Sequence, residues 1–245
     1  MKSLNQNFLK NKINFVYWHR SVIQRKHIEQ FLARQVTIEI DLSFDEMSQK
    51  PYIGHSGEIY NSFFDKLLIG SSFRNISFEA LMSYINKSQL SVVLDCKSSK
   101  VLEYISKNIN KFNLENVFFH AFISEWCFDK ENRRYKECIK LEDIKEFKKI
   151  TKSFWIGSSL VKNYNQVDST IIKRIADTGK NIVDGVSFFT HYHQLLFPKL
   201  SVYKKISDIG YIPVFASDLI FVKTDFEYIG VSTFICNCTK NKYEK

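Results

Sequence analysis

Two carboxylates stand two positions apart inside an otherwise apolar stretch of the sequence, "TIEIDLSFDE" at positions 37–46. The β-branched and aromatic residues predict a strand, and on a strand Glu39 and Asp41 leave the same face. Adjacent carboxylates repel each other and resist burial, so this pair requires a cation, a shared proton or open water. The pair therefore indicates either a metal site or the solvated face of a half-exposed strand.

A third carboxylate and a lysine end another apolar run, "LSVVLDCK" at positions 90–97. Asp95 and Lys97 share a strand face, and a structural ion pair between them is one explanation of the pattern. Together with Glu39 and Asp41, Asp95 also completes a set of three oxygen ligands. Such a set suits Mg²⁺ or Ca²⁺ and does not suit a soft metal.

Two histidines add groups that titrate near neutral pH. His19 follows the apolar run "INFVYW", and His55 lies in the loop sequence "PYIGHSG". Either could instead be structural, His19 as a buried histidine beside Trp18 and His55 as a surface residue. Arg20 and Lys97 add fixed positive charge. Carboxylates with a metal, two histidines and fixed cations together describe a site that holds a phosphodiester and transfers a proton on each side of it.

Other residues with reactive side chains carry weaker signals. His120, in the apolar run "VFFHAF", fits either the lining of the site or the core. His191 and His193 have the spacing of a metal pair but no evident third ligand, so they are interpreted as structural. Cys236 and Cys238 share a strand face and are interpreted as small core residues.

The elements that must position these residues alternate along the chain. Short runs rich in Val, Ile and Phe predict eight strands, at 13–19, 36–44, 90–97, 117–122, 153–160, 182–189, 211–217 and 232–237. Stretches with helical spacing predict helices at 25–35, 77–89, 100–112, 141–152, 168–180 and 198–210. Eight strands in βα order predict an α/β fold, a (β/α)8 TIM barrel with its site at the carboxyl ends of the strands. A doubly wound open sheet is the alternative.

Composition favours a single domain over residues 1–245. The sequence is 44% hydrophobic, with only 8 Gly and 3 Pro, and contains no linker or low-complexity tract at which to divide it. The net charge of +9 is dispersed along the chain. It indicates a solvated basic surface or peripheral contact with an anionic membrane, without a motif for specific nucleic-acid binding.

The five cysteines are odd in number and include no CxxC pair, so they predict neither a disulfide framework nor a zinc knuckle. Reduced thiols and an N-terminus that lacks the pattern of a secretory signal indicate a cytoplasmic protein. No window approaches the roughly 20 apolar residues of a membrane span. The sequence carries no signal of oligomeric state.

The ordered motifs "WHR", "IEID", "PYIGHS" and "VVLDCK", followed by "PVFASD" and "STFICN", resemble the glycerophosphodiester phosphodiesterase superfamily of phospholipase-C-like barrels. The run "IEIDLSFD" is also similar to the sphingomyelinase D branch, and "YWHRS" with "LDCKS" is similar to the menorin branch. The chain departs from the family pattern in three places. Glu-Asn-Thr does not follow His-Arg, Ser56 stands where aspartate is usual, and Phe215 stands where tryptophan is common.

The resemblance implies a metal-dependent phosphodiesterase that cleaves a glycerophosphodiester or a related lipid or glycan head group, with a cyclic phosphate as one product of such chemistry. Glu39, Asp41 and Asp95 would bind Mg²⁺ or Ca²⁺, His19 and His55 would act as acid and base, and Arg20 and Lys97 would stabilise charge on the phosphoryl oxygens. The departures keep a second interpretation open, a catalytically silent barrel that binds a phosphorylated ligand or a partner protein.

Overall fold

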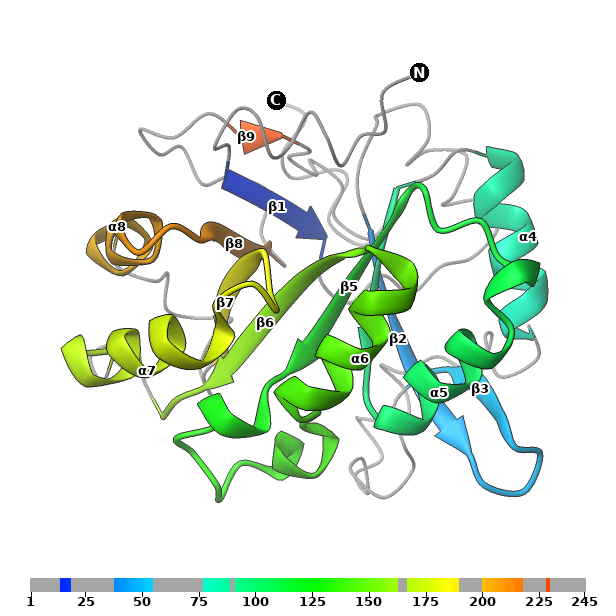
Figure 1. The fold of residues 1–245 in the computed structure, drawn as a ribbon, viewed down its shortest axis with the longest axis horizontal. Helices are drawn as coiled ribbons and strands as arrows, with labels where there is room; N and C mark the ends of the chain where they lie inside the picture. The colour runs from blue at the N-terminus through cyan, green and yellow to red at the C-terminus, as the bar shows by residue number, and fades with distance from the viewer. Residues whose placement is uncertain are drawn as a thin grey trace, which may run out of the picture.

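The computed structural model describes residues 14–18, 38–54, 77–88, 91–162, 167–189, 200–217 and 228–229. Within these ranges the chain is a mixed α/β fold, in which helices lie around the outside of one mostly parallel sheet (Figure 1). The predicted helix at 25–35 and the predicted strand at 232–237 lie outside the described residues.

Nine strands form the described sheet. Their bounds are β1 Asn14–Trp18, β2 Ile38–Asp45, β3 Lys50–Ile53, β4 Val92–Cys96, β5 Val117–Phe122, β6 Phe154–Leu160, β7 Gly185–Phe189, β8 Ile212–Ser217 and β9 Tyr228–Ile229. They lie in the order β3-β2-β4-β5-β6-β7-β8-β1-β9, and every pairing except that of β2 with β3 is parallel. Seven of the predicted strands are therefore confirmed. The strand β3 was not predicted, because it contains Pro51, which a sheet tolerates at an edge such as this one.

The first strand, β1, links the two ends of the parallel part of the sheet. This strand pairs with β8 along one edge and with β2 at Trp18 and Ile38. Val93 of β4, Phe118 of β5 and Val214 of β8 share one buried cluster, although β4 and β8 are far apart in the strand order. The sheet is therefore strongly curved, which is consistent with a TIM-barrel-like fold. This curved part contains seven described parallel strands, and the eighth predicted strand, at 232–237, lies outside the described residues.

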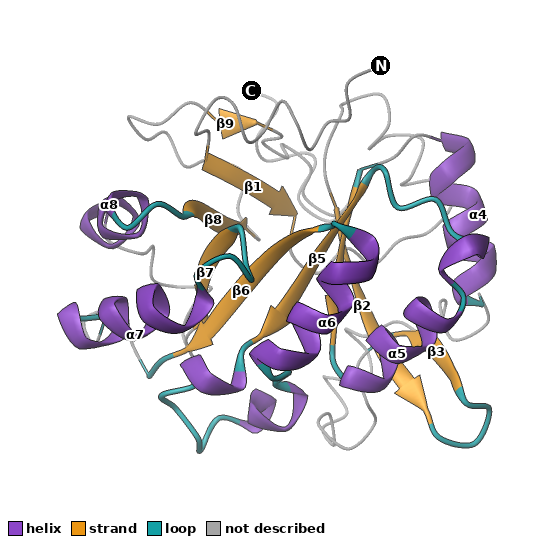
Figure 2. Cartoon of the chain, viewed as in Figure 1, coloured by secondary structure: helices purple, strands orange, loops and turns teal. Residues whose placement is uncertain are grey.

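Five α-helices lie within the described ranges. They are α4 Phe78–Ser88, α5 Ser99–Lys107, α6 Leu141–Thr151, α7 Ser169–Gly179 and α8 Leu200–Asp208, and they confirm five predicted helices (Figure 2). Local signals explain where some begin. At α7, for example, the Asp168 carboxylate accepts hydrogen bonds from the N–H groups of Thr170 and Ile171. None of these described helices is long and apolar enough to cross a membrane.

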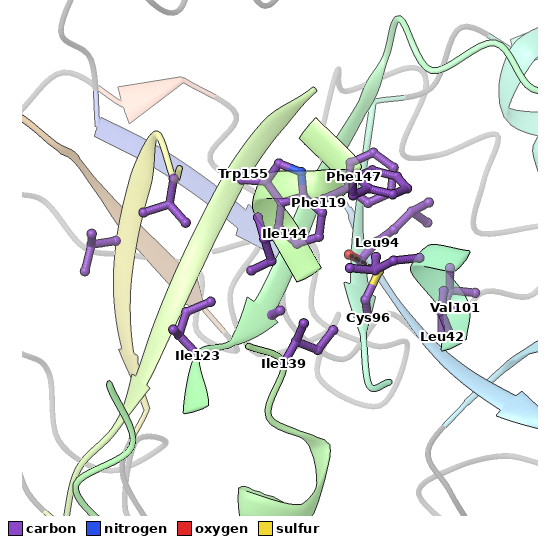
Figure 3. Close-up of a cluster of buried hydrophobic side chains, with 14 of the residues drawn as sticks. Leu42, Leu94, Cys96, Val101, Phe119, Ile123, Ile139, Ile144, Phe147 and Trp155 are labelled. Atoms are coloured by element: carbon purple, nitrogen blue, oxygen red, sulfur yellow. Dashed lines mark hydrogen bonds between the residues drawn. The ribbon is translucent and has the colours of Figure 1, made fainter. Parts of the chain in front are cut away.

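Apolar side chains pack on both faces of the central strands. On β5, Phe118 points into the interior cluster, whereas Phe119 packs outward against Trp155 of β6 and Phe147 of α6 (Figure 3). The rings of Phe119 and Trp155 are stacked with centroids 5.2 Å apart, and Phe147 meets Phe119 edge-on at 5.0 Å. Burial of both faces explains why these strands appear in the sequence as nearly continuous apolar runs.

Trp126 anchors the segment after β5 to the outer layer of the fold. Its side chain is fully buried, and its Nε1 donates a hydrogen bond to the Thr178 hydroxyl over 2.8 Å. The indole lies against the backbones of Gly157 on β6 and Gly179 on α7. A Cβ atom at Gly157 would stand 2.5 Å from the ring, so the close packing requires glycine there.

We expect Gly157→Ala to lower the free energy of unfolding by about 1–3 kcal/mol, because the added methyl group must displace the Trp126 ring. Urea denaturation followed by circular dichroism measures this cost. In a Trp126→Phe background the smaller ring leaves room for the methyl group, so the cost of Gly157→Ala should be lower there. Equal costs in the two backgrounds would contradict the close packing.

Candidate metal centre

Strand register brings the predicted acidic residues together. Asp41 on β2 lies opposite Asp95 on β4, and Asp95 lies opposite His120 on β5. Glu39 precedes Asp41 by two positions and leaves the same face of β2. Glu39, Asp95 and His120 are only 3%, 1% and 3% exposed. Burial to this degree excludes a solvated strand face for Glu39, whereas the Asp41 side chain is 21% exposed.

Three of these side chains form a compact group of ligand atoms. Among the described residues, a carboxylate oxygen of Glu39, one of Asp95 and a ring nitrogen of His120 all lie within 4.8 Å of one another. The His120 Nδ1 is 2.8 Å from the Asp95 Oδ1. Two carboxylates and an imidazole at this spacing can bind a divalent metal ion. His120, for which the sequence left a choice between site and core, thus joins two of the predicted ligands.

Lys97 lies between the two carboxylates that face each other across β2 and β4. Its Nζ is 2.9 Å from the Asp41 Oδ1 and also forms an ion pair with the Asp95 Oδ2. The Lys97 side chain is 2% exposed and that of Asp41 is 21% exposed. The ion pair between Asp95 and Lys97 considered from the sequence is therefore present, and it extends to Asp41.

Burial and charge act in opposite directions on these groups. Burial by itself would raise the pKa of Asp95, but the ammonium of Lys97 and the contact with His120 outweigh it and lower that pKa to about 2. Burial also disfavours the charged form of Lys97, yet Asp41, Asp95 and Glu137 together raise the pKa of Lys97 above its ordinary value. At neutral pH, Asp95 is therefore a carboxylate and Lys97 an ammonium.

Two buried serines continue the polar group across the next strands. The Ser158 hydroxyl on β6 lies 2.6 Å from the His120 Nε2 and forms a hydrogen bond with the Ser187 hydroxyl on β7. A hydrogen bond to one ring nitrogen orients a histidine whose other nitrogen faces a metal site. Sequence reasoning missed both serines, although the small polar run "GSS" inside an apolar strand was an available signal for Ser158.

The loop between β5 and α6 adds two buried charges near Lys97. Arg134 and Glu137 belong to the short 3₁₀ helix η3 (Arg133–Glu137) in this loop. The Lys97 Nζ and the Arg134 Cζ each lie 5.6 Å from the centre of the Phe122 ring, which is within the range of cation–π attraction. No pattern in the sequence marks Arg134 or Glu137, because their place depends on the fold of the loop.

Seven residues singled out in the sequence lie outside the described residues: His19, Arg20, His55, His191, His193, Cys236 and Cys238. The residues that directly precede two of them are described. Trp18, before His19, pairs with Ile38 at the start of β2. Gly54, before His55, donates its N–H to the Asp41 carbonyl over 2.9 Å. The roles of His19, Arg20 and His55 stay predictions.

No protein-family model and no curated protein matches the sequence. A solved glycerophosphoryl diester phosphodiesterase from Parabacteroides distasonis ATCC 8503 is similar, at 12% identity and a TM-score of 0.43, over 83% of this chain and 82% of that chain. A chitinase from Chromobacterium violaceum ATCC 12472 has 7% identity and a TM-score of 0.33, over 72% of this chain and 55% of that chain. Both TM-scores are below 0.5, so neither likeness indicates a function, and only the side chains of the site can do so.

Lys97→Met is expected to destabilise the protein by about 3–5 kcal/mol at pH 7, because Asp95 is left buried without its cation. The difference in the free energy of unfolding between the wild type and Lys97→Met should decrease as the pH is lowered from 7 to 5. In the wild type the lowered pKa of Asp95 favours folding above the ordinary carboxyl pKa, and this contribution is lost only as the pH falls toward 2. Without Lys97 the main charge that lowers this pKa is absent while burial still raises it, so protonation of Asp95 at lower pH relieves part of the cost in the variant.

The same substitution at Lys100 is the matched control. Lys100 pairs with Glu46 over 2.6 Å, but the two side chains are 51% and 64% exposed. Its loss should cost less than about 1 kcal/mol across the same pH range. Urea denaturation at several pH values measures both variants. A Lys97→Met variant as stable as Lys100→Met would show that the buried charges are not coupled in the way described.

Proposed function

We propose that the protein is a metal-dependent phosphodiesterase acting on a glycerophosphodiester or a related lipid or glycan head-group phosphodiester. One observation carries this proposal. The register of β2, β4 and β5 gathers Glu39, Asp95 and His120 within 4.8 Å of one another, beside the buried ammonium of Lys97. A set of metal ligands next to a fixed cation suits a phosphodiester, whose negative charge must be stabilised during cleavage.

Glu39 and Asp95 are the proposed metal ligands, with His120 as the third. Asp41 is the alternative third ligand, and it lies 2.9 Å from Lys97. A bound divalent ion would act as a Lewis acid toward a non-bridging phosphoryl oxygen. Ligation by oxygen alone favours Mg²⁺ or Ca²⁺, whereas an imidazole nitrogen also suits Mn²⁺ or Zn²⁺.

The cations of the site have a separate role in the proposal. Lys97 stays charged at neutral pH because two carboxylates surround it, and it would stabilise negative charge on the phosphoryl oxygens. Arg20, which follows the end of β1 by two positions, is the proposed second cation. Ser158 orients the His120 ring by its contact with the Nε2 atom.

Proton transfer is proposed for the two remaining histidines. His19 and His55 would form the acid/base pair, in which one takes the proton of the attacking hydroxyl group and the other protonates the leaving alcohol. When a hydroxyl of the substrate attacks, the product is a cyclic phosphate. The pairing of Trp18 with β2 and the hydrogen bond of Gly54 to Asp41 support this arrangement, because each histidine directly follows one of these residues.

The proposal includes the complete fold, a single TIM-barrel domain over residues 1–245. The pairings of β1 with both β2 and β8 support closure of the sheet. An eighth strand, as in a (β/α)8 barrel, would come from the predicted strand at 232–237. The position of β9 (Tyr228–Ile229) beside β1 supports this placement, since β9 directly precedes the predicted strand in the chain.

Phosphorus NMR tests the reaction with a panel of glycerophosphodiesters and lysophospholipids in the presence of Mg²⁺, Ca²⁺ or Mn²⁺. The wild type is expected to release a phosphomonoester or a cyclic phosphate. Glu39→Gln should be slower by about 100-fold or more, because it removes a direct metal ligand. The matched control is Glu46→Gln, which changes an exposed carboxylate just after β2 and should leave the rate unchanged. Turnover insensitive to Glu39→Gln would overturn the assignment of the site.

Thermal melting tests metal binding independently of turnover. At a metal concentration about 100 times the Kd, binding adds about 2.7 kcal/mol to stability. For a chain of this size the melting temperature should rise by about 5–10 °C. Glu39→Gln and His120→Gln should reduce the rise, and Asp41→Asn tests the alternative third ligand. Melting that is indifferent to chelator and to all added ions would contradict the metal centre, whereas binding without turnover would favour the catalytically silent barrel.

A further inference from the structure

Two cysteines stand in contact in the loop between β5 and α6. Cys127 directly follows the 3₁₀ helix η2 (Ser124–Trp126), and Cys138 directly follows η3. Their Sγ atoms are 2.8 Å apart. This distance is shorter than the usual approach of two non-bonded sulfur atoms and about 0.8 Å longer than a disulfide bond.

Hydrogen bonds hold the backbone on both sides of this thiol pair. The residue after the second cysteine, Ile139, donates its N–H to the Phe122 carbonyl at the end of β5 over 2.7 Å. The residue after the first cysteine, Phe128, donates its N–H to the Leu160 carbonyl at the end of β6 over 2.9 Å. The two thiols are therefore held in place by strand ends, and joining them requires little movement of the backbone.

We propose that Cys127 and Cys138 form a redox-modification site, which closes to an intramolecular disulfide bond with a small disulfide such as glutathione disulfide as the oxidant. The Cys138 thiolate attacks one sulfur of the oxidant and releases the first glutathione thiol. The Cys127 thiol loses its proton and attacks the Cys138 sulfur, which releases the second. The two protein thiols lose two electrons and two protons, and the oxidant is reduced to two thiols.

The exposure and the pKa of the two thiols determine which one reacts first and how fast the exchange is. Cys138 is partly exposed and Cys127 is buried, so Cys138 reacts first with an oxidant from solution. The contact with Cys127 raises the pKa of Cys138, and burial and the charges of Glu137 and Glu125 raise it further. The thiolate is therefore scarce at neutral pH, and the exchange is slow.

The disulfide bond would restrain a segment that carries charges of the candidate metal centre. Arg134 and Glu137 lie between the two cysteines, and both act on the protonation of Lys97. Phe122, whose ring lies 5.6 Å from the Lys97 Nζ, packs in the same cluster as Cys127. Disulfide formation would therefore restrict the positions of Arg134 and Glu137 beside Lys97, and this effect does not depend on which reaction the site performs.

Peptide mapping without reduction tests the proposal on the wild-type protein. The protein is incubated for hours in buffers of rising glutathione disulfide to glutathione ratio, free thiols are alkylated, and peptides are analysed by mass spectrometry. The expected product is a peptide pair linked through Cys127 and Cys138, with the mass of two hydrogens lost. Cys96, fully buried on β4, should react only after unfolding and is the internal reference. The proposal would be overturned if Cys127 and Cys138 were both still free thiols, and so alkylated, at the highest glutathione disulfide ratio. A stable mixed disulfide with glutathione would also overturn it.

Oxidation should also raise the melting temperature by about 5–10 °C, because a cross-link across a loop of this length restrains the unfolded chain. Cys138→Ser should abolish the shift, and Cys96→Ser, the matched control, should retain it. If oxidation still raised the melting temperature of Cys138→Ser, the rise would come from other cysteines, and the proposed role of this pair would be overturned. Neither measurement uses turnover, so its outcome is independent of the proposed phosphodiesterase activity.

Discussion

Buried charge at the centre of the sheet is the constraint on which the rest of this structure depends. An ammonium or a carboxylate alone in a protein interior is strongly disfavoured. Lys97 and Asp95 are nevertheless buried, because Lys97 contacts both Asp95 and Asp41. This arrangement exists only while β2 and β4 keep the register that places Asp41 opposite Asp95. A slip of one residue would turn one strand's carboxylates to the other face and leave the charges unpaired.

Apolar packing on both faces of the strands keeps that register. Phe118 fills the interior on the same strand from which Phe119 packs outward against Trp155. The interior apolar cluster and the polar group of His120 and Ser158 therefore share one face of the sheet, at successive levels. The outer layer also holds the loop after β5 through Trp126, and this loop carries further charge to the site. Stability and site geometry thus depend on the same strand pairings.

Much of the fold was predictable because periodicity is a local property. Seven strands and five helices lie where their apolar patterns predict them, and the grouping of Glu39 with Asp95 follows from spacing of two on parallel strands. The strand β3 was missed because Pro51 obscures it, and its edge position explains why proline is tolerated. The pairing of β8 with β1, which curves the described sheet, could not be predicted from spacing along the sequence, because the two strands are far apart in the chain.

The sequence by itself determined which residues could do chemistry, since side-chain type and the two-residue period of a strand are local properties of the sequence. Only the tertiary structure decided which groups became partners. Lys97 contacts Asp41 as well as its neighbour Asp95, His120 lies between Asp95 and Ser158, and Arg134 approaches Phe122 from a loop. The contact of Cys127 with Cys138 is of the same kind. These distances join residues that strand register and loop folding bring together, and charge and thiol interactions act only at such short range.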